Sequence, residues 1–236
     1  MGPPKTSLRR PPWSKGYTKK THPSLARMAD KMRTLDNLKA WRNKQQTYWR
    51  SLHQPLAKDD DLAELIGVVL GDGNISAFPR SERLVIACNT QKPKFSERYA
   101  TMVEKLFKKK PKVLVSPTSN STRISIYQKF ISKRLDVPAG NRGKISFSIP
   151  SWIWNNSDFL IRYLRGLYEA EGSFCVHKPT STYKMLFSNR NPSLLENVFR
   201  GVQKLGFHPH RSGYQIQLSR KEEVYRFKEL IQFRVY

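Results

Sequence analysis

Two stretches of the chain, 99 residues apart, repeat one pattern of apolar and small residues. The first places apolar side chains at helical spacing, at Leu62, Leu65, Ile66, Val69 and Leu70. It also carries Gly67 and Gly71 four residues apart, and the second stretch carries Gly166 and Ala170 in the same way. A row of small residues lets two helix backbones approach closely. The pattern therefore predicts two helices that pack against each other.

Alternating apolar and polar residues after each of these helices predict strands. In the first half we expect a hairpin over residues 74–78 and 83–89, a helix over 93–107 and a second hairpin over 112–116 and 122–128. Leu84, Ile86, Ile124 and Ile126 would face the core. The second half repeats this order, with each half reading helix, hairpin, helix, hairpin, helix.

The repeat keeps its register well beyond the two stretches. Five residues of the first half reappear 99 positions later: Pro93, Glu97, Val103, Lys105 and Leu106 match Pro192, Glu196, Val202, Lys204 and Leu205. Chance does not readily preserve such a register. The chain therefore divides into two related halves, which we expect at residues 59–150 and 151–236.

Both helices are expected to end on an acid, Asp72 in the first and Glu171 in the second. The negative end of a helix dipole disfavours a carboxylate in the last turn, so stability alone does not explain these acids. If the small faces pair, the two carboxylates meet, and like charges so close need a cation between them. Oxygen ligands favour Mg²⁺. A plainer interpretation is a pair of core helices whose acids merely begin turns.

A small-x-x-x-small row followed by acid-Gly, present twice, resembles the LAGLIDADG homing endonucleases over roughly residues 59–236. The resemblance implies an α+β fold in which two pseudo-symmetric αββαββα-like repeats form a DNA-binding β-saddle around two central motif helices. It implies a monomeric, intron-encoded, site-specific endonuclease that cuts double-stranded DNA at a long, roughly pseudo-palindromic target and leaves short 3′ overhangs.

The resemblance also implies the active-site residues. Asp72 and Glu171 would be catalytic and, with the backbone carbonyls of Gly71 and Ala170, would hold Mg²⁺, or Mn²⁺, or Ca²⁺ in a non-cleaving complex. Lys144 matches the family's additional basic residue, with Arg142 as a substitute. The equivalent of Lys144 would be residue 243, whereas the sequence ends at Tyr236. We therefore expect that position near the end, or one centre without its Lys and hence a nicking enzyme.

Strand residues that face away from the core are candidate readers of the major groove. For these residues a solvated surface and a DNA contact are weighed about evenly, and the basic charge of the chain favours DNA. The candidates are Asn74, Ser76, Arg80, Arg83, Asn89, Gln91, Arg123, Ser125, Tyr127, Ser173, His177, Lys178, Lys184, Arg211, Gln215, Gln217 and Ser219.

The net charge of +25, from 43 basic and 18 acidic residues, indicates a polyanionic partner. Attachment to a ribosome or a membrane surface would suit the charge equally. No stretch is apolar and long enough to span a membrane, and Cys88 and Cys175 form neither a zinc set nor a disulfide framework. We expect a cytoplasmic, nucleoid-associated or organellar protein that is not secreted.

Residues 1–58 carry 14 Lys and Arg residues against two acids. Aromatic and basic residues alternate at the start, where Arg9, Arg10, Lys19 and Lys20 are candidate DNA contacts. Helices are expected from Pro23 to Leu35 and from Leu38 to about Leu52. We interpret this basic, partly helical extension as an accessory DNA contact; the alternative is a tail that only improves solubility.

Two other functions fit the same fold. An RNA-binding intron maturase would use the same basic and aromatic residues. A transcription regulator could keep the fold and lose cleavage, although the intact acids speak against it. Retained metal-dependent cutting separates both from an endonuclease.

Overall fold

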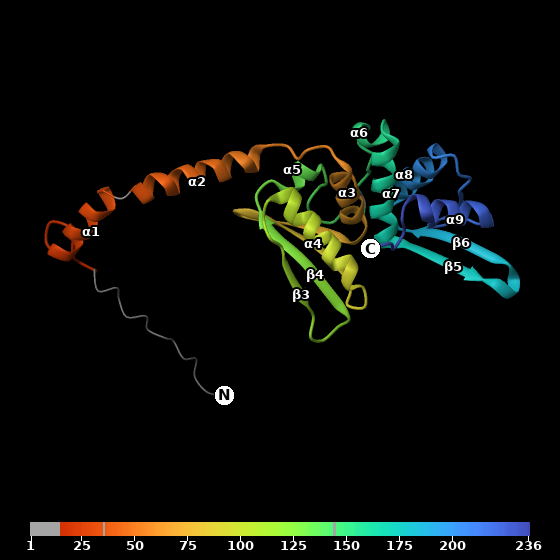
Figure 1. Cartoon of the computed structure of the whole chain (residues 1–236), viewed down its shortest axis with the longest axis horizontal. Helices are drawn as coiled ribbons and strands as arrows, with labels where there is room; N and C mark the ends of the chain where they lie inside the picture. Colours follow the sequence, from red (N-terminus) through yellow and green to blue (C-terminus); the bar gives the residue numbers. More distant parts are fainter. Residues whose placement is uncertain (1–14, 35, 144) are drawn as a thin grey trace. The chain divides into compact units, whose positions relative to one another are not determined.

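The computed structural model describes residues 15–34, 36–143 and 145–236, and it divides the chain into two compact units, Met1–His53 and Gln54–Tyr236 (Figure 1). The first unit contains α1 (Pro23–Thr34) and α2 (Asp36–His53), close to the predicted helices. Several large apolar side chains of its described part are exposed, among them Trp41 and Met32. No described side chain of this unit is buried.

The centre of the second unit is the pair of motif helices, α3 (Asp60–Asp72) and α7 (Ser157–Glu171). Both start at a capping side chain, because Asp59 accepts the amide hydrogen of Leu62, and Asn156 accepts those of residues 158 and 159. A Cβ on Gly67 would lie 2.3 Å from the carbonyl oxygen of Tyr163, and one on Gly166 would lie 2.1 Å from that of Glu64. The predicted close packing of small residues is thereby confirmed.

The first sheet has the strand order β1-β2-β4-β3 and is antiparallel throughout. Its strands are β1 (Gly73–Phe78), β2 (Ser81–Asn89), β3 (Lys112–Val115) and β4 (Ser121–Gln128). Leu84 pairs with Ile126 and Ile86 with Ile124, all four buried as predicted. The helices α4 (Pro93–Phe107) and α5 (Ile131–Leu135) cover this apolar face. Among the described residues of the second unit, no helix packs on the other face of the first sheet, which is called its open face below.

The second sheet repeats this topology with the order β5-β6-β8-β7. Its strands are β5 (Gly172–His177), β6 (Thr182–Ser188), β7 (His210–Ser212) and β8 (Gln215–Leu218). The helices α8 (Pro192–Lys204) and α9 (Lys221–Leu230) pack on one face and leave the other open. The predicted order of elements is confirmed in both halves. Two short elements were not expected, α6 (Ser151–Trp154) and a 3₁₀ turn at Lys178–Thr180.

Glu64 anchors the motif-helix pair at the end opposite the acids. Its carboxylate is fully buried and accepts hydrogen bonds from Arg98 Nε at 2.7 Å and Arg98 Nη2 at 2.8 Å. Arg162 of α7 lies 2.8 Å away and the Tyr99 hydroxyl 3.1 Å away. A buried carboxylate is tolerated when it is paired in this way. The network ties both motif helices and α4 together.

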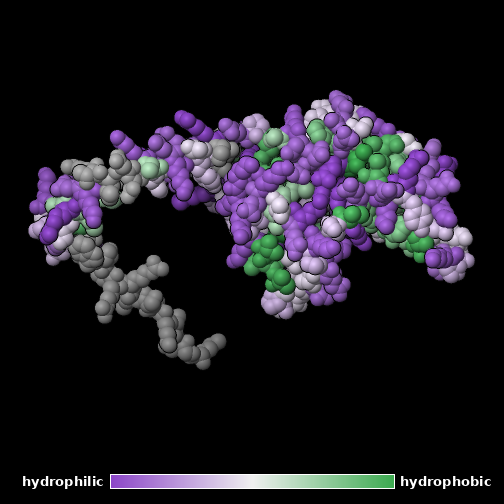
Figure 2. Space-filling model, viewed as in Figure 1, coloured by the Kyte–Doolittle hydropathy of each residue, from purple (hydrophilic) through white to green (hydrophobic). Residues whose placement is uncertain are grey.

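Hydrophilic residues cover most of the face of the molecule that is shown in Figure 2. An exception lies over β3, where Val113, Leu114 and Val115 are 45%, 48% and 65% exposed. Within the described ranges, no helix has the length and apolar character needed to cross a membrane.

Candidate active site and nucleic-acid interface

Asp72 and Glu171 are the last residues of α3 and α7, and the helix packing brings them to one end of the pair. A Cβ on Gly71 would lie 2.5 Å from Cβ of Ala170 and 3.2 Å from Cγ of Glu171. Small residues at this point are therefore required for the two acids to approach each other.

Gly73 and Gly172 cap the two motif helices and begin the following strands, as the sequence predicts. Their backbones are extended, with φ of −90° and −87°, so no left-handed conformation demands glycine. The demand is steric: a Cβ on Gly73 would lie 2.5 Å from Cα of Val69, and one on Gly172 would lie 2.3 Å from the carbonyl oxygen of Tyr168. The chain therefore turns directly from each acid into a strand.

The surroundings of the acids disfavour their charged forms. Burial, and then the charge of Glu171, raise the pKa of Asp72 to about 7, against a smaller opposing effect of Lys92. Burial also raises the pKa of Glu171, which a hydrogen bond from Asn189 Nδ2 at 3.2 Å partly offsets. A cation bound between the two carboxylates would favour their charged forms at this helix C-terminus.

The donor set fits a hard divalent cation. It offers two carboxylates and the carbonyl groups at two helix ends, which lack intrahelical partners. No cluster of three or more His, Cys, Asp or Glu side chains that could hold a metal occurs in the described part of the chain. Mg²⁺ commonly binds through one or two carboxylates, with water and substrate phosphates completing its shell. Asp72 and Glu171, with the carbonyls of Gly71 and Ala170, are the residues that would hold it.

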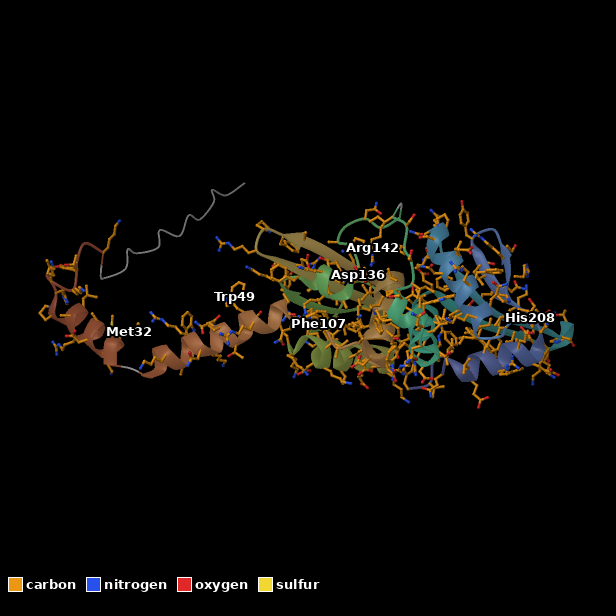
Figure 3. All side chains as sticks on the ribbon, turned by 90° about the horizontal axis from the view of Figure 1, so that it is seen from above. Met32, Trp49, Phe107, Asp136, Arg142 and His208 are labelled. Carbon is orange, nitrogen blue, oxygen red and sulfur yellow. The ribbon has the colours of Figure 1, made fainter. Side chains whose placement is uncertain are left out.

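Two arginines flank the acids in equivalent ways. Arg142, on the segment between α5 and α6 (Figure 3), donates from Nη2 to the carbonyl oxygen of Gly73, the residue after Asp72. Arg234 donates from Nη2 to the carbonyl oxygen of Gly172, the residue after Glu171, at 3.2 Å. Burial lowers the pKa of Arg142 from its usual value, and its Nη1 is buried with no hydrogen-bond partner among the described residues. The glycine that follows each acid therefore binds a guanidinium through its carbonyl oxygen.

Arg234 is the residue that the 99-residue offset did not find. The second half is shorter after its last hairpin, so the equivalent of Arg142 comes at 234 and not at 241. Glu169 fixes this segment: its buried carboxylate accepts the amide hydrogen of Arg234 at 2.6 Å and the hydroxyl hydrogen of Tyr236. Arg234 is thus the counterpart of Arg142, and the counterpart of Lys144 stays a prediction. Lys144 lies outside the described residues.

Most of the candidate DNA-reading residues lie on the open faces. In the first sheet these are Asn74, Ser76, Arg83, Asn89, Arg123, Ser125 and Tyr127, and in the second Ser173, His177, Lys184, Gln215 and Gln217, with Ser219 directly after β8. Arg80, Gln91 and Lys178 lie in the turns that follow strands. Lys19 and Lys20 belong to the first unit, and Arg9 and Arg10 lie outside the described residues.

Arg211 is the candidate that the structure places elsewhere. It pairs with Ile216, whose side chain is buried beneath the helices, and its guanidinium lies 3.9 Å from Glu196 of α8. Because strand side chains alternate, its neighbours His210 and Ser212 face the open side instead. Because β7 has only three residues, the alternation of polar and apolar side chains is too short to predict which face Arg211 occupies. Lys112, Leu114 and His210 are open-face residues that the sequence analysis missed.

Comparison with known proteins establishes the fold. Residues 58–137 match the family model of the WhiA N-terminal LAGLIDADG-like domain. A structure of mesophilic variants of the homing endonuclease I-DmoI is 20% identical, with 73% of this chain and 94% of that chain covered and a TM-score of 0.50. The protein has a LAGLIDADG-like fold. The fold expected from the sequence is thus confirmed.

Two further structures share this fold. Full-length DUF199/WhiA from Thermatoga maritima is 14% identical, with 78% of this chain and 59% of that chain covered and a TM-score of 0.55. An I-DmoI variant solved with its nicked target DNA in the presence of Mn is 18% identical, with 75% of this chain and 98% of that chain covered and a TM-score of 0.50. No curated protein matches the chain.

Proposed function

We propose that this protein is a site-specific endonuclease of the homing type, which hydrolyses both strands of a DNA duplex in a metal-dependent reaction and leaves short 3′ overhangs. One observation carries the proposal. Asp72 and Glu171, whose pKa values are raised, lie directly before the first strands of the two sheets, so the pair of acids stands between the two open faces. A protein that only bound DNA would have no use for two neighbouring carboxylates whose charged forms are disfavoured.

Asp72 and Glu171 would hold the cation, and a cation bound there would lower the pKa of water and neutralise charge on the phosphate. Residues of the protein itself would bind and orient the phosphates. Arg142 and Arg234 bind the glycines that directly follow the two acids, and their remaining guanidinium donors would bind the phosphate of each strand and stabilise charge that develops on it. The close packing of α3 on α7 would keep these groups fixed before the DNA arrives.

The remaining surface would bind the duplex. Each repeat, 59–150 and 151–236, would contact half of the target through its open face, because an antiparallel sheet can enter the major groove. One chain supplies both acids, so a monomer suffices. Residues 1–58 would add an accessory contact, to which Lys19 and Lys20 contribute exposed positive charge.

A DNA-binding protein that does not cut is the second candidate, because residues 58–137 match the WhiA N-terminal LAGLIDADG-like domain. It would use the same open faces and basic charge. Such a protein would have no need of paired acids or of the two arginines beside them. The acids and arginines therefore favour cutting.

The test is cleavage of a randomised duplex library by the full chain in Mg²⁺, with EDTA as the control, followed by sequencing of the cut ends. We expect one long site, cut on both strands with 3′ extensions, and no cutting in EDTA. Tight binding without cutting in Mg²⁺, Mn²⁺ or any other divalent cation would support the non-cutting protein. Preferential binding of a structured intron RNA would support a maturase.

A further inference from the structure

One row of paired residues differs in chemistry between the two sheets. In the first sheet Ala87 pairs with Arg123, which pairs with Leu114 across β2, β4 and β3. In the second sheet the row consists of Ser188, Gln215 and Ser212 across β6, β8 and β7. We call these the apolar-arginine row and the serine-glutamine row.

The two rows occupy equivalent positions. Gly73, which follows the first acid, pairs with Ile86, and Ala87 is the next residue. Gly172, which follows the second acid, pairs with Phe187, and Ser188 is the next residue. The difference between the rows is therefore a difference between the halves at one matched place.

Both rows face the open side of their sheets. Ile86 and Ile124 are buried, so the alternation of a strand directs Ala87 and Arg123 to the other face. Phe187 and Ile216 are buried in the same way and direct Ser188 and Gln215 outward. Leu114, which pairs with Arg123, is 48% exposed on this side.

Both rows also lie next to the acids. Glu171, Ser188 and Gln215 line one hollow of about 450 Å³. In the first half Ala87 follows Ile86, which pairs with Gly73, the residue after Asp72. In the first sheet one further open-face pair, Asn89 with Ser121, lies beyond its row. Both rows therefore belong to the inner part of each open face, and they would meet base pairs near the cut.

The polar members of the rows have their donors available for a ligand. In the described ranges Arg123 makes no side-chain hydrogen bond or ion pair, and neither does Gln215. Arg83, by contrast, lies over the rings of Phe78 and Tyr127 and donates to the Tyr127 hydroxyl at 3.4 Å. Arg123 and Gln215 are consequently better placed to read bases.

We propose that the two rows read different bases, so that the target is asymmetric at matched inner positions of its two halves. Arginine binds guanine through O6 and N7, glutamine binds adenine through N6 and N7, and apolar side chains contact the thymine methyl group. The apolar-arginine row selects guanine beside thymine in one half-site. The serine-glutamine row selects adenine in the other. This inference rests on the proposed binding of duplex DNA by the open faces.

The test is a binding selection from a randomised duplex library by the full chain in Ca²⁺, repeated with Arg123→Gln, Gln215→Arg and Arg211→Gln. Wild type should enrich guanine at an inner position of one half and adenine in the other. Arg123→Gln should convert that guanine to adenine, and Gln215→Arg should convert that adenine to guanine, each with a change of roughly tenfold or more in relative affinity. Arg211→Gln removes the same charge from the helix side and should change no base preference.

The thymine contact is tested on the selected duplex by replacing thymine with uracil in one half at a time. Loss of one methyl contact should weaken wild-type binding by roughly three- to fivefold on the apolar-arginine side, and Leu114→Ser should abolish that difference. The inference would be overturned if Arg123→Gln and Gln215→Arg left the inner base preferences unchanged, or if uracil had no effect on binding. Either result would leave the proposed binding of duplex DNA intact. A selection that enriches no sequence would overturn the proposed function and the inference together.

Discussion

At the scale of single residues, the account depends on two carboxylates that are unfavourable in the metal-free protein. Asp72 is the stronger case, because burial and the charge of Glu171 raise its pKa to about 7. The folded protein therefore holds a proton on Asp72 that the unfolded chain, with an ordinary pKa near 3.8, releases. Stability is present below the unfolded pKa and is lost as pH rises through the folded pKa.

This predicts the pH dependence of stability in EDTA. Between pH 4 and pH 7 wild type should lose stability that Asp72→Asn retains, so at pH 8 the variant should be more stable by about 1–3 kcal/mol, allowing for partial solvent screening. Urea unfolding of wild type and Asp72→Asn at pH 4 and at pH 8 measures the difference. Asp158→Asn, at the favourable N-terminal end of α7, is the matched control and should lower stability slightly. An Asp72→Asn variant that is less stable than wild type at pH 8 would contradict the assignment.

If each arginine serves one strand, removing it should slow the cutting of that strand alone. Removing Arg234 should slow the cut beside Glu171 by about 10- to 100-fold, so that nicked duplex accumulates, and Arg142→Ala should have the same effect on the other strand. Arg234→Lys, which keeps the charge, should recover part of the rate. The ratio of nicked to linear plasmid carrying the selected site measures this. Arg226→Ala, on α9 against Phe207, is the control and should leave the ratio unchanged.

At the scale of elements, the packing of α3 on α7 determines whether the acids meet. Gly67→Ala and Gly166→Ala would each place a methyl group within 2.3 Å of a backbone carbonyl oxygen of the opposite helix. The helices would have to separate, which we expect to destabilise the protein by about 3 kcal/mol or more.

Gly201→Ala is the matched control for these substitutions. Gly201 lies in α8, and its new methyl group would meet only side-chain atoms at 3.4 Å or more. Higher helix propensity should make this variant equally stable or more stable by about 0.5–1 kcal/mol. Urea unfolding of the three variants measures the contrast, and equal losses in all of them would contradict the packing.

The elements themselves were predictable because their signals are local. Helical spacing and strand alternation depend on neighbouring residues, so the boundaries of α4, β2 and β4 followed closely from the sequence. The partners of Glu64 and the position of Arg234 were not predictable, since they join residues distant in the chain through lengths that differ between the halves. The face of Arg211 was missed because β7 has only three residues. The acids were found because each ends a strongly periodic helix.

At the scale of the whole molecule, charge determines affinity for any duplex. With a net charge of +25, binding should weaken steeply with salt through counterion release. Lys19 and Lys20 are exposed in the first unit. If they contact phosphates, replacing both with Gln should reduce the slope of log affinity against log salt by about 1.8. Titrations from 50 to 200 mM salt test this; an unchanged slope would remove the first unit from the DNA contact.

The central claim is that Asp72 and Glu171 are needed for cutting the DNA, whereas other residues, chiefly those of the open faces, bind it. It is tested most directly by measuring binding and cutting of the selected duplex side by side for wild type, Asp72→Asn and Glu171→Gln in Mg²⁺. The account predicts that binding changes by less than about threefold while cutting of the duplex falls by at least about a thousandfold. Cutting that survives in either variant, or binding that is lost together with cutting, would contradict it.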